Sequence, residues 1–118
     1  MRTLILGICS ATFVHMVHGQ APVQPPKTWA TCAACHAPQG TTSIGPPLNG
    51  VVGRKAGSVP GFGYSRAMKS ANITWDDKSL AGFLEDPQQA VPGNRMPFAG
   101  VSDPGEVAEL VKYLKTLR

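Results

Sequence analysis

The sequence predicts an all-α protein built from a few short helices and long ordered loops. Residues 80–84 and 107–114 repeat apolar side chains at spacings of three and four, which is typical of helices with one buried face. Most other segments are rich in glycine and proline, and none alternates convincingly as a β-strand does. A chain of 118 residues is expected to form a single domain.

Residues 1–19 are interpreted as a secretory signal peptide that is cleaved after Gly19. A short positive start precedes a mostly apolar run from Leu4 to Val17. An uncleaved anchor is disfavoured because this run is shorter than the roughly 20 residues that a membrane-spanning helix needs. A lipidated Cys9 is disfavoured because the apolar run continues past it.

Export would place the mature chain, residues 20–118, in an oxidising compartment, which we expect to be the periplasm. The mature chain keeps few residues with metal-binding or redox chemistry. They are His36, Cys32, Cys35, Met68 and Met96. Without the arginine of the leader the formal charge falls from +4 to +3, ten basic residues minus seven acidic ones, which does not argue for a nucleic-acid partner.

The first half of the mature chain is predicted to be mostly irregular. Residues 20–25 form a flexible, proline-rich lead, and a short helix is expected from about Pro26 to Cys35. Residues 37–63 carry recurring glycines and prolines and form a long loop, which normally indicates either function or disorder. Residues 65–70 are expected to form one or two helical turns.

The second half is predicted to hold the two better helices. The first should start at Thr74, with Asp77 completing a capping box, and should end before Pro87. An irregular stretch follows. The last helix should be capped by Ser102 or Asp103, with a proline in its first turn.

The motif CAACH, from Cys32 to His36, matches the attachment signature of c-type haem. Cysteines three residues apart lie on one helical turn, so both sulfurs can form thioethers with one porphyrin, and His36 can then coordinate the iron. A dithiol oxidoreductase is disfavoured because no strand precedes Cys32. Zinc is disfavoured because three Cys and His residues are too few for a tetrahedral site. A disulfide between Cys32 and Cys35 would be strained and would leave the histidine unexplained.

The second axial ligand must come from a short inventory. With no other histidine in the mature chain, the candidates are the thioethers of Met68 and Met96. Met96 is favoured, because it lies in an irregular loop braced by prolines, whereas Met68 lies in a short helical segment and is expected to fill the core. With both axial positions filled, electron transfer is favoured over bond-making chemistry, so we do not expect an enzyme.

The chain resembles the class I cytochromes c of mitochondria and bacteria. The resemblance runs from about Trp29 to Leu117 and rests on CAACH, GPPLNGVVGRKAG, VPGFGYS, NITW and VPGNRMPFAG, in that order. It implies a class I cytochrome c fold around one covalent haem c, with His36 and Met96 as the iron ligands.

The same resemblance implies further haem-binding residues, which are Pro46, Arg54, Tyr64 and Trp75. The carbonyl of Pro46 should orient the ring of the haem-binding histidine. The other three should stabilise the haem propionates, because an unpaired buried carboxylate is costly. Residues with supporting roles are also implied: Leu48 and Phe98 in the pocket wall, Asn94 as a brace of the methionine, and Arg95 on the surface.

Several positions depart from the family pattern. Prolines at positions 25 and 26 shorten the N-terminal helix and should reduce its contact with the last helix. Phe83 replaces a tyrosine and Met68 an asparagine, so the haem surroundings should be less polar. Positions that are lysines around the haem edge of mitochondrial members are uncharged or acidic here: Thr31, Ser43, Gln88, Gln89 and Asp103. Electrostatic steering toward an acidic partner should therefore be weak.

These features predict a soluble, monomeric periplasmic carrier of single electrons between redox proteins, with no small-molecule substrate. Two alternatives stay open. One is a cytochrome subunit of a periplasmic oxidoreductase complex. The other, less favoured, is a haem peroxidase or gas sensor with a labile methionine ligand.

Overall fold

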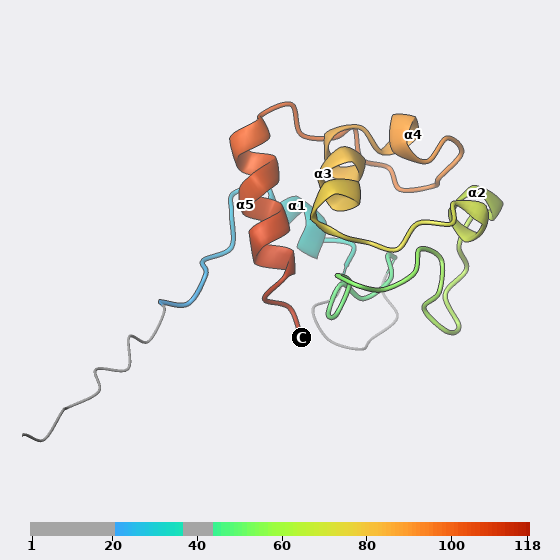
Figure 1. Ribbon diagram of the computed structural model, residues 1–118, viewed down its shortest axis with the longest axis horizontal. Helices are drawn as coiled ribbons and strands as arrows, with labels where there is room; N and C mark the ends of the chain where they lie inside the picture. Colours follow the sequence, from blue (N-terminus) through green and yellow to red (C-terminus); the bar gives the residue numbers. More distant parts are fainter. Residues whose placement is uncertain (1–20, 37–43) are drawn as a thin grey trace, which may run out of the picture.

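The computed structural model describes residues 21–36 and 44–118, and it confirms a helical protein. Within these residues, five helices follow one another (Figure 1): α1 (Trp29–Ala33), α2 (Arg66–Ser70), α3 (Asp77–Glu85), α4 (Pro87–Ala90) and α5 (Pro104–Leu114). In these residues there is no strand, only an isolated bridge between positions 55 and 74. No helix in the described part of the chain is long and apolar enough to cross a membrane. The expected signal peptide and position 43 lie outside the described residues.

The core forms where α3 and α5 lie against each other, as the two apolar stripes predict. These helices bury Leu80, Phe83, Leu84, Val107, Leu110, Val111 and Leu114. Each such side chain contributes about 1.5–3 kcal/mol when it leaves water. The helix pair is therefore the scaffold that holds the surrounding loops.

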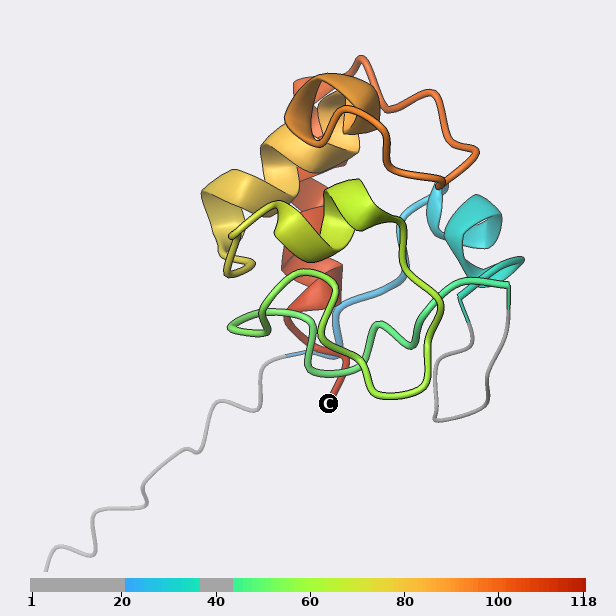
Figure 2. The same ribbon diagram turned by 90° about the vertical axis from the view of Figure 1, so that its right-hand side faces the viewer.

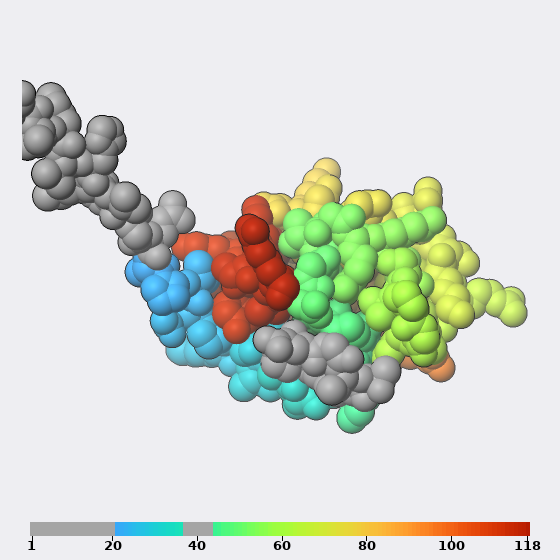
Figure 3. Space-filling view, turned by 90° about the horizontal axis from the view of Figure 1, so that it is seen from below, coloured from blue at the N-terminus to red at the C-terminus, as the bar shows by residue number. Residues whose placement is uncertain are grey.

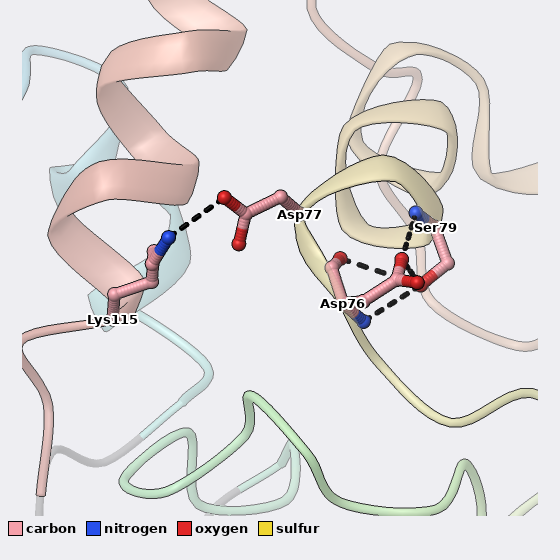
Figure 4. Close-up of polar contacts among 4 residues, drawn as sticks. All are labelled: Asp76, Asp77, Ser79 and Lys115. Atoms are coloured by element: carbon pink, nitrogen blue, oxygen red, sulfur yellow. Dashed lines mark hydrogen bonds and ion pairs between the residues drawn. The ribbon is translucent and has the colours of Figure 1, made fainter.

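The start of α3 differs from the prediction, because Asp76 rather than Thr74 caps the helix. The Asp76 carboxylate accepts a hydrogen bond from the backbone N–H of Ser79 at 2.7 Å, and the Ser79 hydroxyl accepts the Asp76 N–H at 2.8 Å (Figure 4). Asp77 does not complete the capping box. Its carboxylate instead forms an exposed ion pair at 2.7 Å with Lys115, just beyond α5. An aspartate nearer the helix is the better cap, and it displaces the threonine.

The expected helix end before Pro87 is confirmed, but the same proline begins α4. The Asp86 carboxylate accepts the N–H groups of Gln88 and Gln89 at 3.1 and 2.9 Å and caps this single turn. Such a helix is too short to show a period in the sequence. The predicted cap of the last helix, Asp103, is confirmed.

Helix α1 spans Trp29–Ala33 and is shorter than the predicted helix over positions 26–35. Its N-terminal end is fastened to α5. The Thr28 N–H and hydroxyl both donate to the Glu106 carboxylate, the former at 3.0 Å. The rings of Trp29 and Tyr113 meet edge to face with centroids 4.8 Å apart. Of the lead before it, residues 21–25 form no regular element, and Val23 is half-buried beside α3 and α5.

Residues 44–65, the glycine loop, have a fixed course without regular structure. The N–H of Gly50 donates to the Leu117 carbonyl at 2.7 Å, and that of Gly53 to the Trp75 carbonyl at 2.7 Å. In Figure 3 the C-terminal residues (red) lie against this loop (green). The described part of the predicted long loop is therefore ordered rather than disordered, because its backbone is bonded to distant segments.

Candidate functional site

A cavity of about 530 Å³ lies among α1, the glycine loop, α2, α3 and residues 95–98. The sequence predicts four residues that bind the cofactor covalently or axially, and all four line this cavity. They are Cys32, Cys35, His36 and Met96. Its wall is mainly apolar and includes the core residues Leu80 and Phe83. Folding thus brings together two motifs that lie far apart in the sequence.

The two cysteines line the cavity as free, half-buried thiols, Cys32 within α1 and Cys35 just beyond its end. Burial raises the pKa of the Cys32 thiol, a backbone hydrogen bond opposes the rise, and neighbouring Cys35 adds to it. The Cys32 thiol donates to the Thr28 carbonyl at 3.6 Å. A dithiol oxidoreductase needs the opposite shift, since its attacking sulfur must be a thiolate. The site therefore gives no support to the dithiol alternative.

The His36 ring is held in one orientation by the chain that follows it. Its Nδ1 lies 2.7 Å from the Pro46 carbonyl oxygen. Because a carbonyl only accepts, Nδ1 carries the proton, and Nε2 is left with a free lone pair for a metal. Gly45 lies directly against the ring, since a Cβ atom there would be 2.6 Å from the imidazole. The sequence prediction missed Gly45. A glycine directly before Pro46, whose carbonyl was expected to orient the ring, could have indicated this close contact.

Met96 lies in residues 91–103, the ligand loop, which is braced from within. The buried Asn94 donates from Nδ2 to the carbonyls of Pro87 and Val91 at 2.7 and 3.0 Å. Its Oδ1 accepts the Met96 N–H at 2.9 Å. The implied role of Asn94 as a brace is thus matched by these contacts. Gln88, which the prediction treats only as a surface position, also donates to the Asn94 carbonyl at 3.1 Å.

Arg54 is the half-buried cation of the cavity. Its guanidinium donates to the carbonyls of Asn49 and Pro47 at 3.1 and 2.7 Å. Burial lowers the pKa of Arg54, and the nearby Tyr64 opposes this change. No carboxylate of the described residues pairs with this guanidinium. Its charge would be stabilised by an anionic group on a bound molecule.

The remaining predicted residues also reach the cavity. Burial raises the pKa of the Tyr64 hydroxyl, so this group stays a hydrogen-bond donor at neutral pH. Trp75 is buried against Phe83, with ring centroids 5.1 Å apart. Met68 lines the cavity as well, as a half-buried residue of α2. Leu48 and Phe98 lie in the wall as the resemblance implies.

These residues fit a haem c group. Paired thiols, one imidazole with a free nitrogen, the thioethers of Met96 and Met68, an apolar wall and a half-buried cation face a single cavity. No cluster of three or more His, Cys, Asp or Glu side chains suited to a metal ion occurs in residues 21–36 and 44–118. The structure therefore offers nothing in support of the zinc alternative.

Comparison with known proteins identifies the family of this chain. The family model for cytochrome c matches residues 26–118. Cytochrome c2 iso-2 of Magnetospirillum molischianum is 43% identical over 94 residues, which cover 79% of this chain and 97% of that protein. Cytochrome c2 of Rhodomicrobium vannielii is 37% identical over 121 residues, covering 98% of this chain and 97% of that protein.

A solved structure shows the same fold. Cytochrome cH from Methylobacterium extorquens superposes with a TM-score of 0.73 at 45% identity, covering 76% of this chain and 92% of that chain. The family binds haem c covalently and comprises electron carriers rather than enzymes. The chain belongs to the cytochrome c family and is a class I c-type cytochrome.

Proposed function

We propose that this protein is a soluble, monomeric, monohaem cytochrome c that carries single electrons between redox proteins of the periplasm. The observation that carries the proposal is the shared cavity of Cys32, Cys35, His36 and Met96. Haem c held there supplies a one-electron redox centre. The relatives named cytochrome c2 support an exported carrier.

Each residue of the site would act on that group in a defined way. Cys32 and Cys35 would hold it covalently, and His36 and Met96 would fill both axial positions of the iron. Pro46 keeps Nε2 of the imidazole free by accepting the Nδ1 proton. A thioether ligand in an apolar wall disfavours the more charged ferric state, so the potential rises.

Arg54, Tyr64 and Trp75 would act on the periphery of the same group. The half-buried guanidinium of Arg54 would neutralise a propionate. The Tyr64 hydroxyl and the Trp75 indole N–H would donate hydrogen bonds to the propionate oxygens. These donors would remove the cost of burying a carboxylate without a partner.

The mouth of the cavity is where a redox partner would dock. The exposed residues that line the cavity are Thr31, Ile44, Lys55, Gly63, Arg95 and Pro97. Ile44, with 77% of its surface exposed, is the exposed large hydrophobic residue of the described chain. This rim is partly apolar and carries only two charged residues, Lys55 and Arg95, so it supports a partner with a partly apolar face and only weak steering toward an acidic one.

The test is a pair of methionine variants of the exported, haem-loaded protein. We expect Met96→Ala to abolish the long-wavelength absorption band of methionine-ligated ferric haem and to lower the reduction potential, because the thioether is lost. Met68→Leu, the matched control, should retain the band. Retention of the band in Met96→Ala, or its loss in Met68→Leu, would contradict the assignment.

Mass and purification state test the other parts of the proposal. The mature protein should begin at Gln20 and carry the mass of one haem. A wild-type protein that lacks the methionine–iron band at neutral pH would instead indicate the peroxidase or gas-sensor alternative. Constant co-purification with a catalytic subunit would indicate a cytochrome subunit of a complex.

A further inference from the structure

The ligand loop is anchored at both of its ends. Near its start the buried Asn94 is bonded to carbonyls of Pro87 and Val91. Near its end the Val101 N–H donates to the Leu84 carbonyl at 2.9 Å. Between these anchors the hydrogen bond from the Phe98 N–H to the residue 96 carbonyl, at 2.9 Å, lies within the loop itself. The Met96 N–H is likewise bonded to Asn94 within the loop, so any link from this stretch to the facing wall must come from a side chain.

One side chain joins this stretch to the facing wall. The guanidinium Nη2 of Arg95 donates to the carbonyl of Gly63 in the glycine loop. Among the hydrogen bonds of the described residues, this bond alone links the two loops. Both partners line the cavity, and Figure 2 shows the ligand loop (orange) above and the glycine loop (green) below.

We propose that Arg95 is a positioning residue that holds Met96 in place by tying the ligand loop to the Gly63 carbonyl. This inference rests on the proposed function, in which Met96 is an iron ligand. Because Arg95 directly precedes Met96, the bond to Gly63 resists a movement of the ligand loop that would withdraw the thioether. The tie thereby limits the access of outside ligands to the axial position.

Arginine suits this role chemically. Its guanidinium stays charged at any physiological pH, and hydrogen bonds from a charged donor are stronger than those from a neutral one. Its long side chain can cross from one loop to the other while remaining at the surface, where Arg95 is exposed. The expected surface position of Arg95 is thus confirmed, and its contact adds a function that the sequence did not suggest.

The alternative is that Arg95 acts only through its positive charge. Arg66 provides a matched control, because it is an exposed arginine of α2 whose side chain makes no hydrogen bond within the described residues. Arg66→Gln and Arg95→Gln remove the same charge, but only the second removes the tie.

The experiment measures the binding rate of imidazole to the ferric haem-loaded protein, at a pH where imidazole is neutral. At saturating imidazole this rate reports the departure of Met96. We expect Arg95→Gln to bind about fivefold faster, the change that one ordinary hydrogen bond supplies. Arg95→Lys, which keeps one charged donor, should show a smaller increase, and Arg66→Gln should match the wild type.

The outcomes separate the two proposals. An Arg95→Gln protein that binds imidazole at the wild-type rate overturns the tie, and so does an equal increase in Arg66→Gln. Either result leaves Met96 ligation intact if the wild type shows the methionine–iron band. A wild type without that band overturns the proposed function, and the tie with it.

Discussion

At the residue scale, the orientation of His36 depends on two small features of the backbone. One is the Pro46 carbonyl, which lies 2.7 Å from Nδ1. The other is the lack of a side chain at Gly45. Any side chain there would collide with the imidazole ring. The imidazole is therefore positioned by the glycine loop and not by α1 alone.

We predict that Gly45→Ala shifts the imidazole and weakens its bond to the iron. The added Cβ atom would lie 2.6 Å from Cε1 and Nδ1 of His36, closer than such atoms normally approach. The backbone there is fastened as well, since the Gly45 N–H donates to the Cys35 carbonyl at 2.8 Å. We expect an altered ferric spectrum and potential, with thermal unfolding at a lower temperature.

Gly82→Ala is the control for this substitution. A Cβ atom at Gly82, in the middle of α3, would meet no atom within 4 Å. Replacing a helical glycine by alanine should stabilise the protein by about 0.5–1 kcal/mol. If Gly45→Ala behaved like Gly82→Ala in chemical denaturation and in its spectrum, the proposed close fit of the imidazole would be wrong.

At the element scale, sequence periodicity predicted the long helices well and the short ones poorly. The stripes of α3 and α5 identify the two helices whose stability comes from burial. Helix α4 has four residues and no stripe, so only Asp86 and Pro87 could have indicated it. The cap at Asp76 was missed because Thr74 and Asp77 offered a competing capping box of similar local quality.

The docking of α1 could not be predicted from local sequence at all. Its end is held by Glu106, which lies in the first turn of α5 and is separated from Thr28 by 78 positions. The sequence predicted reduced contact between the first and last helices, because prolines at positions 25 and 26 shorten the first one. That prediction did not consider a polar contact between them. A polar contact supplements the edge-to-face contact of Trp29 with Tyr113.

We predict that Glu106→Ala destabilises the protein by about 1–2 kcal/mol, because the Thr28 N–H and hydroxyl lose a charged acceptor that is partly buried. Chemical denaturation of the haem-loaded protein measures this change. Glu109→Ala, at an exposed position of the same helix, should change the free energy of unfolding by less than about 0.5 kcal/mol.

A double-mutant cycle with Thr28→Val isolates the contact from other effects of the glutamate. The two substitutions should be non-additive by about 1 kcal/mol, since either one removes the hydroxyl–carboxylate bond. Additive losses would show that the hydroxyl–carboxylate bond does not contribute, because the residue 28 N–H can still donate to Glu106 in Thr28→Val.

At the scale of the whole molecule, the sequence indicated four residues that share the cavity, but not the contacts that hold them there. The motif CAACH and the inventory of two methionines pointed to the four residues that share the cavity. The ties at Arg95 and Glu106 join segments that lie 32 and 78 positions apart, and each depends on how the chain folds back on itself. No local pattern encodes such pairings.

The surface around the cavity mouth leads to the last prediction, which concerns docking. Lys55 and Arg95 are the charged residues among the exposed ones that line the cavity, and the guanidinium of Arg95 is already bonded to Gly63. We expect the rate of electron transfer to membranes of the source organism to fall by less than about twofold between low and moderate ionic strength, because few charges steer the encounter. Ile44→Lys should lower this rate at every ionic strength by placing a hydrated cation in an apolar contact, whereas Ile44→Val should leave it unchanged. A steep decline of the wild-type rate with salt would show that charges outside the mouth guide the partner, and an unaffected Ile44→Lys protein would show that the partner docks elsewhere.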